Sequence, residues 1–173
     1  ERWDAGIIPE DMTIADYPVT YDELEPFFDR FERVAGISGI AGNIRGEIRD
    51  GGNPYEGWRS RDYPMPPLPM TWNGVKFAEA AKAMGYHPFP RPGGNASTSY
   101  VNEYGMQMGA CNFCGFCERY GCYQYSKSSP QTTILAALFR KPNFSYRTGA
   151  EVLRVEMATD GRTATGVTYY DEA

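Results

Sequence analysis

The chain has 173 residues, of which 42% are apolar, a size and composition that suit one domain with its own core. The formal net charge of −5 and the lack of a lysine or arginine cluster argue against a phosphate-binding surface, so we expect no nucleic-acid partner. No apolar run approaches the roughly 20 residues of a membrane span, and no targeting signal is visible. The first residue is not methionine, and we expect a piece of a longer protein.

The first predicted helix follows the sequence TYDE, a capping-box pattern at residues 20–23. Gly36 is a natural C-terminal cap. Because Pro26 removes one backbone hydrogen bond, we expect a short first turn and then a helix from about Glu25 to Ala35. Apolar residues at helical spacing predict a stripe that faces the core, made up of Leu24, Phe27, Phe28, Phe31, Val34 and Ala35.

Residues 37–71 are rich in glycine and proline and contain no periodic segment. A loop of this length is uncommon in a compact protein. Its tyrosines, tryptophan and prolines indicate either an ordered segment that acts as a lid or docking surface, or a poorly ordered insertion.

Two further helices are predicted. One fits Asn73 to Met84, with Gly85 closing it. Its expected apolar face comprises Phe77, Ala80, Ala81 and Met84. The other begins in SSPQTTILAALF, where Ser129 is the expected N-cap and Pro130 the first helical residue.

The C-terminal part carries a β-strand pattern. The runs FSYRT, EVLRVEMA and TATGVTYY predict three short strands, and Asp160-Gly161 predicts the turn between the last two. The fold class expected for the chain is therefore α+β. We expect a loop-rich segment with about three helices and a C-terminal antiparallel β-unit that belongs to a larger protein.

All four cysteines of the chain lie in the stretch CNFCGFCERYGC, as Cys111, Cys114, Cys117 and Cys122. Three closely spaced thiols are typical of an iron–sulfur site, because two intervening residues let neighbouring sulfurs turn toward one cluster. Gly115 and Gly121 supply backbone freedom for such wrapping. Four thiolates also suit a structural zinc ion, although zinc sites usually join two separated pairs. Disulfides within so short a stretch would be strained.

Several segments in order resemble the middle of the GMC-family FAD-dependent oxidoreductases. They are YPVTYDELEPFFDRFE, GYHPFPRPGGN, the cysteine stretch, SSPQTTILAALF and NFSYRTGAEVLRVEMATDGRTATGVTYY. The cysteine stretch narrows the resemblance to the large subunits of the gluconate, sorbitol and fructose dehydrogenase type. The resemblance implies that residues 1–143 are a substrate-side region that includes the cysteine loop (111–122). It also implies that residues 144–173 are a hairpin of the FAD-binding domain of a larger α/β protein.

The resemblance implies an FAD-dependent dehydrogenase of CH–OH groups in sugars, polyols or sugar acids. Electrons would pass through a 3Fe-4S or 4Fe-4S cluster on the four cysteines to a cytochrome c-type subunit or a quinone, and a small subunit would complete the enzyme. It implies a place at the periplasmic face of the cytoplasmic membrane. It also implies that the backbone of Val152 contacts the adenine of FAD.

No catalytic residue is assigned within the chain. The family's G-x-G-x-x-G loop and its catalytic histidine have no counterpart here, and His87 beside a proline is expected to be a loop residue. We therefore expect the chain by itself to be inactive. The alternative hypothesis is a non-enzymatic domain in which the four cysteines hold a structural zinc ion.

Overall fold

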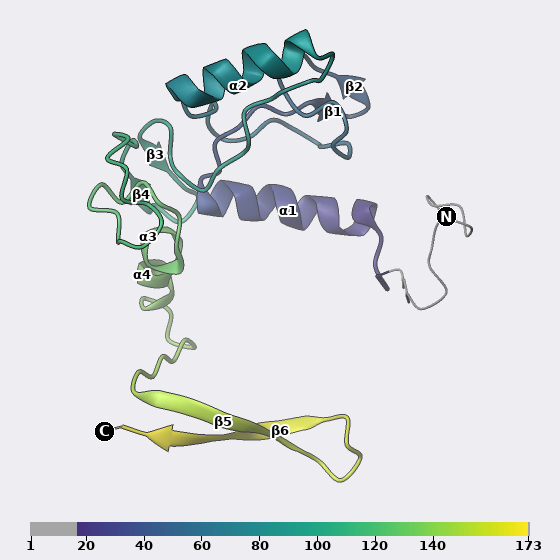
Figure 1. Ribbon diagram of the computed structural model, residues 1–173. Coiled ribbons are helices and arrows are strands. Elements are labelled where there is room, and N and C mark those ends of the chain that lie inside the picture. Colours follow the sequence, from purple (N-terminus) through teal and green to yellow (C-terminus); the bar gives the residue numbers. More distant parts are fainter. Residues whose placement is uncertain (1–16, 173) are drawn as a thin grey trace. The chain divides into compact units, whose positions relative to one another are not determined.

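A computed structural model of the chain describes residues 17–172. The chain forms two compact units, Glu1–Ala137 and Leu138–Ala173. Residues 1–16 of the predicted region 1–143 lie outside the described part, as does Ala173. The fold is α+β, as predicted (Figure 1). The elements of the larger unit are α1 (Tyr21–Ala35), β1 (Asn43–Ile44), β2 (Glu47–Ile48), α2 (Trp72–Ala83), β3 (Tyr100–Val101), β4 (Gln107–Met108) and α3 (Pro130–Thr133), and α4 (Leu135–Leu138) crosses the boundary.

Helix α1 begins at Tyr21, earlier than predicted, because the capping box closes its first turn despite Pro26. The Thr20 amide donates to the Glu23 carboxylate at 2.8 Å, and the Glu23 amide donates to the Thr20 hydroxyl at 3.3 Å. Gly36 ends the helix in the left-handed conformation, with φ of 64°, as predicted.

The predicted stripe of α1 is wrong for its three phenylalanines, whereas Ala35 is buried as predicted. Phe27 and Phe31 are 67% and 63% exposed, whereas Glu25 and Asp29 are only 5% and 6% exposed. The acidic face turns inward because the segment 59–61 lies along it and supplies a hydrogen-bond donor to each acid. A buried carboxylate is tolerated only when it is paired in this way.

Three consecutive residues bind three acids of α1, which are spaced by four and then three positions on one helix face. Arg59 pairs with Glu32, with one Nη donating to Oε1 at 3.1 Å. The Ser60 amide donates to Glu25 Oε1 at 2.7 Å. The Arg61 Nε donates to both Asp29 carboxylate oxygens at 3.0 Å.

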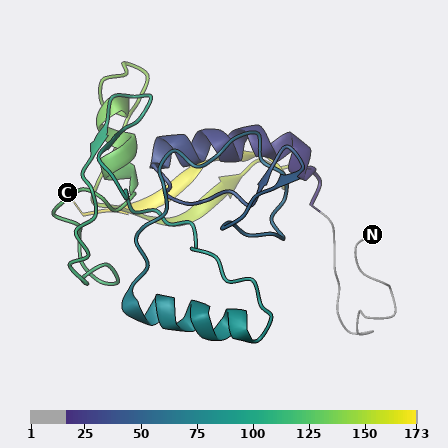
Figure 2. The same cartoon turned by 90° about the horizontal axis from the view of Figure 1, so that it is seen from above.

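The glycine- and proline-rich segment 37–71 is therefore an ordered part of the larger unit. It lies between α1 and α2 in two perpendicular views (Figures 1 and 2). Its only regular structure within the described residues is the β1–β2 hairpin.

Helix α2 matches its predicted range to within one residue, with Thr71 as N-cap. Its predicted apolar face is not a core face, because Ala81 is its only buried residue. Phe77 and Met84 instead line an open groove of about 680 Å³, together with Tyr55 and His87.

The apolar core of the larger unit is small and lies beneath the β3–β4 hairpin. Met65, Ala96 and Met108 are buried there, and Tyr100 packs against them. Polar contacts tie this core to the helices. The Asn102 side chain, 4% exposed, donates to the carbonyl of Val34 at 2.9 Å and to that of Thr133 at 2.6 Å.

The smaller unit consists mainly of an antiparallel hairpin of β5 (Ala150–Met157) and β6 (Ala164–Asp171). The predicted turn is confirmed, because Gly161 has a φ of 64° and Asp160 accepts from the amides of Arg162 and Thr163 at 2.8 and 2.9 Å. The predicted strand in FSYRT is wrong. Phe144 and Tyr146 there contact the ring of Phe139 edge to face, with centroids 5.8 and 5.7 Å away.

The β5–β6 hairpin has one apolar face, and a register shift in its strand pairing keeps the apolar residues on that face. The register shifts between Val152 and Arg154, so that Val152 and Val155 fall on the same face. That apolar face also carries Met157, Val167 and Tyr169. Its apolar residues are exposed within this chain.

Among residues 17–172, no helix is long and apolar enough to cross a bilayer.

Because the buried acids orient α1, we predict that Asp29→Asn lowers the free energy of unfolding by about 1–3 kcal/mol at neutral pH, measured by urea denaturation of the full chain. Burial raises the pKa of Asp29, but hydrogen bonds from Arg61 and Arg33 outweigh burial and hold it below its usual 3.8. This contribution is present above pH 3.8 and is lost as the pH falls through the lowered pKa.

The matched control is Glu79→Gln, which removes the exposed partner of Lys76 on α2 and should leave the unfolding midpoint unchanged. Equal midpoints for Asp29→Asn and Glu79→Gln at neutral pH would contradict the orienting role of the buried acids.

Candidate functional site

The cysteine loop (111–122) leaves the larger unit after β4 and returns to it before α3. Cys111 at its start and Ser126, four residues beyond its last cysteine, are both bonded to Ala96, which is fully buried. The Cys111 amide donates to the Ala96 carbonyl at 2.8 Å, and the Ala96 amide donates to the Ser126 carbonyl at 2.9 Å. The buried Ser126 hydroxyl also donates to the Ala96 carbonyl, at 3.1 Å. The two ends of the loop are therefore held by backbone hydrogen bonds to one strand-like segment.

Gly109 allows the two ends of the loop to approach each other closely. A Cβ atom at this position would overlap the carbonyl oxygen of Gln124, which belongs to the returning segment. A residue with a side chain would push the two segments apart, so glycine is required here by packing rather than by its own backbone angle. Gly121, in the same loop, has open space where its Cβ would lie.

The backbone winds tightly within the loop. Phe113 and Gly115 have φ of 57° and 82°, and Tyr125 beyond the last cysteine has φ of 53°. Left-handed conformations reverse the chain direction over few residues, and they are uncommon for residues with a large side chain. Two of these positions, Phe113 and Gly115, lie between successive cysteines of the loop.

Lys127 and Asn95 lie opposite each other in an isolated antiparallel bridge at the base of the loop. The Lys127 ammonium donates to the carbonyl of Cys117 and to that of Tyr120, the latter at 3.4 Å. The Asn95 side-chain amide lies 4.0 Å from the Cys117 sulfur. Sequence analysis missed both residues, because no local pattern connects Asn95 or Lys127 with a turn elsewhere in the chain.

The four cysteines differ in environment. Cys114 and Cys117 are exposed, Cys111 and Cys122 are partly buried, and all four are free thiols. Burial raises the pKa of the Cys122 thiol, but backbone amides of Lys127, Ser126 and Gln124, with the Lys127 charge, lower it below its usual value. The protein therefore favours the thiolate form of Cys122.

The loop fits a thiolate-bound metal centre in donor chemistry and in backbone winding. Thiolates are the ligands of iron–sulfur clusters and of structural zinc. Within residues 17–172, however, no three side chains of His, Cys, Asp or Glu converge as a metal-binding group. The structure thus places the four predicted ligands on one anchored loop but does not gather their sulfurs.

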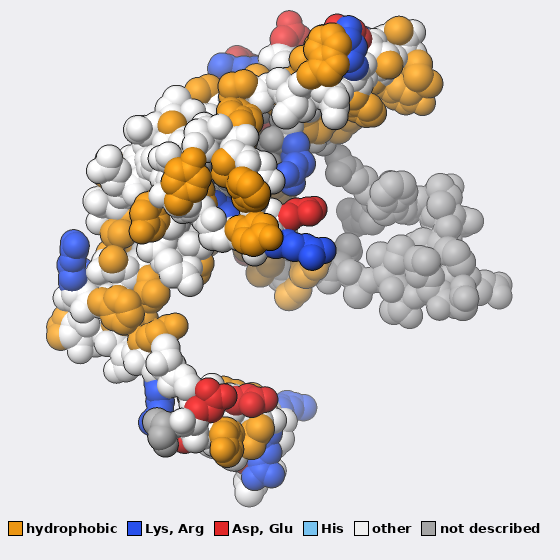
Figure 3. Space-filling view, turned by 60° about the vertical axis from the view of Figure 1, so that its left-hand side comes forward, with side chains coloured by type: hydrophobic (Ala, Val, Ile, Leu, Met, Phe, Trp, Pro, Cys, Tyr) orange, Lys and Arg blue, Asp and Glu red, His pale blue; other side chains and the backbone are white. Residues whose placement is uncertain are grey.

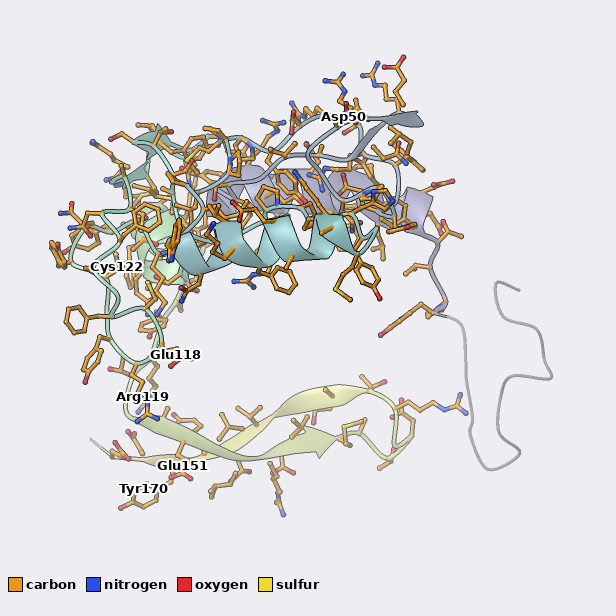
Figure 4. All side chains as sticks on the ribbon, turned by 45° about the horizontal axis from the view of Figure 1, so that its top comes forward. Asp50, Glu118, Arg119, Cys122, Glu151 and Tyr170 are labelled. Atoms are coloured by element: carbon orange, nitrogen blue, oxygen red, sulfur yellow. The ribbon has the colours of Figure 1, made fainter. Side chains whose placement is uncertain are left out.

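Large aromatic side chains lie next to the cysteines in the sequence and are exposed, and Phe116 and Tyr120 contact each other edge to face at 5.9 Å. The exposed rings of the region are Phe113, Phe116, Tyr120, Tyr123 and Tyr125. Exposed apolar side chains also occur elsewhere on the larger unit (Figure 3). Glu118 and Arg119 lie on the same loop as Cys122 and are exposed (Figure 4).

The other predicted site residue, Val152, lies in β5 of the smaller unit and is 57% exposed. It pairs with Tyr169 immediately before the register shift in the hairpin. Val152 thus belongs to the smaller unit and the cysteine loop to the larger unit.

The chain is similar to parts of longer proteins that are named as oxidoreductases. It is 50% identical over 173 residues to the gluconate 2-dehydrogenase flavoprotein of Pantoea cypripedii, a match that covers 98% of this chain and 28% of that protein. It is 30% identical over 140 residues to paromamine 6'-oxidase of Streptomyces fradiae, covering 80% of this chain and 22% of that protein.

A third match, 33% identical over 75 residues, is to 2-methyl-1,2-propanediol dehydrogenase of Mycolicibacterium austroafricanum and covers 43% of this chain and 12% of that protein. The chain therefore spans less than a third of the length of these three relatives. No family model matches the chain.

The close approach at Gly109 predicts that Gly109→Ala loosens the base of the cysteine loop. Amide hydrogen exchange of the full chain should become at least about tenfold faster at Cys111, whose amide bonds to Ala96, because an opening that costs 1.4 kcal/mol less is ten times more populated. Gly121→Ala is the matched control and should leave this exchange unchanged. Unaltered exchange at Cys111 in Gly109→Ala would contradict the packing argument.

Proposed function

We propose that the chain is the cluster-bearing segment of an FAD-dependent dehydrogenase of the GMC type, in which electrons leave the flavin through an iron–sulfur cluster. The observation that carries the proposal is the placing of all four thiols on one loop whose two ends are bonded to the buried Ala96. Support also comes from the 50% identity to a protein named as a gluconate 2-dehydrogenase flavoprotein.

Cys111, Cys114, Cys117 and Cys122 are the proposed ligands of a 3Fe-4S or 4Fe-4S cluster. Such a cluster accepts electrons one at a time, whereas a flavin takes two electrons from an alcohol. The two cofactors together would therefore link the two-electron oxidation of an alcohol to one-electron transfer to an acceptor. The chain contributes the thiolates, the amides directed at Cys122 and the rings that surround the loop. Hydrogen bonds from amides to the sulfurs and the exclusion of water are two ways in which a protein sets the reduction potential of such a centre.

Val152 is the proposed contact of the chain with FAD, through its backbone and the adenine edge. Val152 pairs with Tyr169, and the register shift that follows leaves Leu153 without a cross-strand partner, so the regular ladder is interrupted next to the proposed contact. In the full-length protein, Val152→Thr should therefore keep a full complement of FAD, since the β-branched shape and the backbone are retained. Loss of FAD from a stably folded Val152→Thr protein would contradict a backbone contact.

The proposed substrate is a CH–OH group of a sugar, polyol or sugar acid, and the proposed acceptor is a cytochrome c-type subunit or a quinone. The names gluconate 2-dehydrogenase flavoprotein and 2-methyl-1,2-propanediol dehydrogenase support an alcohol as the group that is oxidised. A small subunit and a periplasmic position are proposed from the family resemblance. No residue of this chain is assigned to the hydride-transfer step, so the chain alone is expected to be inactive.

The ligand assignment predicts the outcome of Cys114→Ser and Cys117→Ser in the full-length flavoprotein. Each change should remove iron while FAD remains bound, because the proposed iron ligands and the proposed FAD contact, Val152, lie in different units of the chain. Flavin reduction by substrate should persist, and reduction of a one-electron acceptor should fall by at least about a hundredfold, since the single-electron exit is lost.

Iron and FAD are measured in the same preparation, so FAD content serves as the internal control for folding. Unchanged iron in both variants would exclude these cysteines as ligands. Zinc in place of iron in the unaltered protein would favour the structural-zinc alternative.

A further inference from the structure

A pocket of about 460 Å³ lies between α1 and residues 56–63 of the larger unit, and the proposed function does not use it. Tyr21, Phe28 and Phe31 line it from α1, and Tyr63 lines it from the opposite segment. Phe28 and Phe31 are exposed in the chain because they form the wall of this pocket instead of part of a core. Pockets of this size hold small organic ligands.

The rings that line the pocket are held in place by their own contacts. The Tyr21 hydroxyl donates to the Trp58 carbonyl at 2.8 Å, and the two rings meet edge to face at 6.1 Å. The Arg59 guanidinium lies 3.9 Å from the centre of the Tyr63 ring and also pairs with Glu32. The pocket is therefore formed before any ligand binds, and a ligand loses little free energy in ordering it.

Two glycines make room for these rings. A Cβ atom at Gly39 would lie 2.7 Å from the ring of Tyr63, and one at Gly57 would lie 3.0 Å from the ring of Tyr21. Both distances are shorter than an ordinary van der Waals contact. A side chain at either position would therefore displace a ring that lines the pocket.

Two polar side chains of the pocket have hydrogen-bonding capacity that the protein does not use. Glu56 Oε1 accepts from the amides of Gly42 and Asn43, whereas no group among residues 17–172 donates to its Oε2. The Tyr63 hydroxyl likewise has no hydrogen-bond partner within the described part of the chain. A ligand hydroxyl can donate to the carboxylate, and another can accept from the phenol.

The charges around the pocket disfavour an anionic ligand. Glu32 and Arg59 neutralise each other, and their side chains are only 16% and 12% exposed. A carboxylate in the ligand would face Glu56 and would find Arg59 already paired. An uncharged compound with several hydroxyls meets no such repulsion, and its C–H groups can pack on the aromatic rings.

We propose that this pocket binds an uncharged sugar or polyol. The C–H groups of the ligand pack on Phe28 and Phe31, and its hydroxyls bond to Glu56 and Tyr63. The inference goes beyond the proposed function, because it depends neither on the four cysteines nor on bound FAD.

The test is amide hydrogen exchange of the full-length flavoprotein without an electron acceptor, in the presence and absence of sorbitol. The amides to follow are those of Arg59 and Ser60, which are bonded to the Asn43 carbonyl and the Glu25 carboxylate. Their exchange should slow about tenfold at a sorbitol concentration of about ten times the Kd, because opening of this segment releases the ligand. Exchange of α2 is the internal control, since a polyol that acts only as an osmolyte slows exchange throughout.

Two pairs of variants locate the ligand. Tyr63→Phe removes only a hydroxyl, and Phe31→Ala removes part of the wall of the pocket, so each should weaken sorbitol binding at least about threefold. Their matched controls are Tyr55→Phe and Phe27→Ala, which change exposed rings outside this pocket. Both controls should bind sorbitol as the unaltered protein does.

Gluconate and glucamine differ from sorbitol at one carbon, where they carry a negative and a positive charge. Weaker protection of Arg59 and Ser60 by both compounds than by sorbitol would support the inference. Tighter binding of either charged compound would overturn the uncharged class of ligand. Slowing by sorbitol that is no greater at Arg59 and Ser60 than in α2 would overturn the site itself. Equal sorbitol affinity in both variants and their controls would also overturn it. None of these outcomes depends on the iron content, which tests the proposed function separately.

Discussion

The pairing of the acidic face of α1 with residues 59–61 is the interaction on which the rest of the larger unit depends. It fixes which side of α1 faces inward, because a buried carboxylate without a partner is far more costly than an exposed phenylalanine. The end of α1 then connects to the region of the cysteines. Tyr100 donates to the Arg33 carbonyl at 2.9 Å, and Asn102 joins the end of α1 to α3.

Hydrogen bonds, more than the burial of apolar side chains, stabilise the part of the larger unit that carries the cysteine loop. The core is made of a few small or flexible side chains, whereas many large apolar side chains remain exposed, including the three phenylalanines of α1 and the apolar face of the β5–β6 hairpin. Exposed apolar surface on this scale is typical of surface that another part of a protein covers. This fits the proposal that the chain acts within a longer flavoprotein.

Local features of the fold were predictable from sequence, and distant contacts were not. The caps at Thr20 and Gly36 and the turn at Asp160-Gly161 each depend on residues within a few positions, so their patterns predicted them correctly. The inward face of α1 depends on Arg59 and Arg61, which no helical period reveals, and FSYRT is not a strand because its rings pack on Phe139. For the site, the spacing of the thiols was visible, but the ties from Asn95, Ala96 and Lys127 required the folded chain.

The central claim is that the anchored cysteine loop holds an iron–sulfur cluster. Iron, zinc and acid-labile sulfide should be measured in the full-length flavoprotein purified without oxygen, together with its EPR spectrum. If the loop holds the proposed cluster, the protein should contain about three or four iron atoms per FAD and a similar amount of sulfide, and its EPR signal should change on addition of substrate. Stoichiometric zinc without sulfide, or FAD with neither metal, would contradict it.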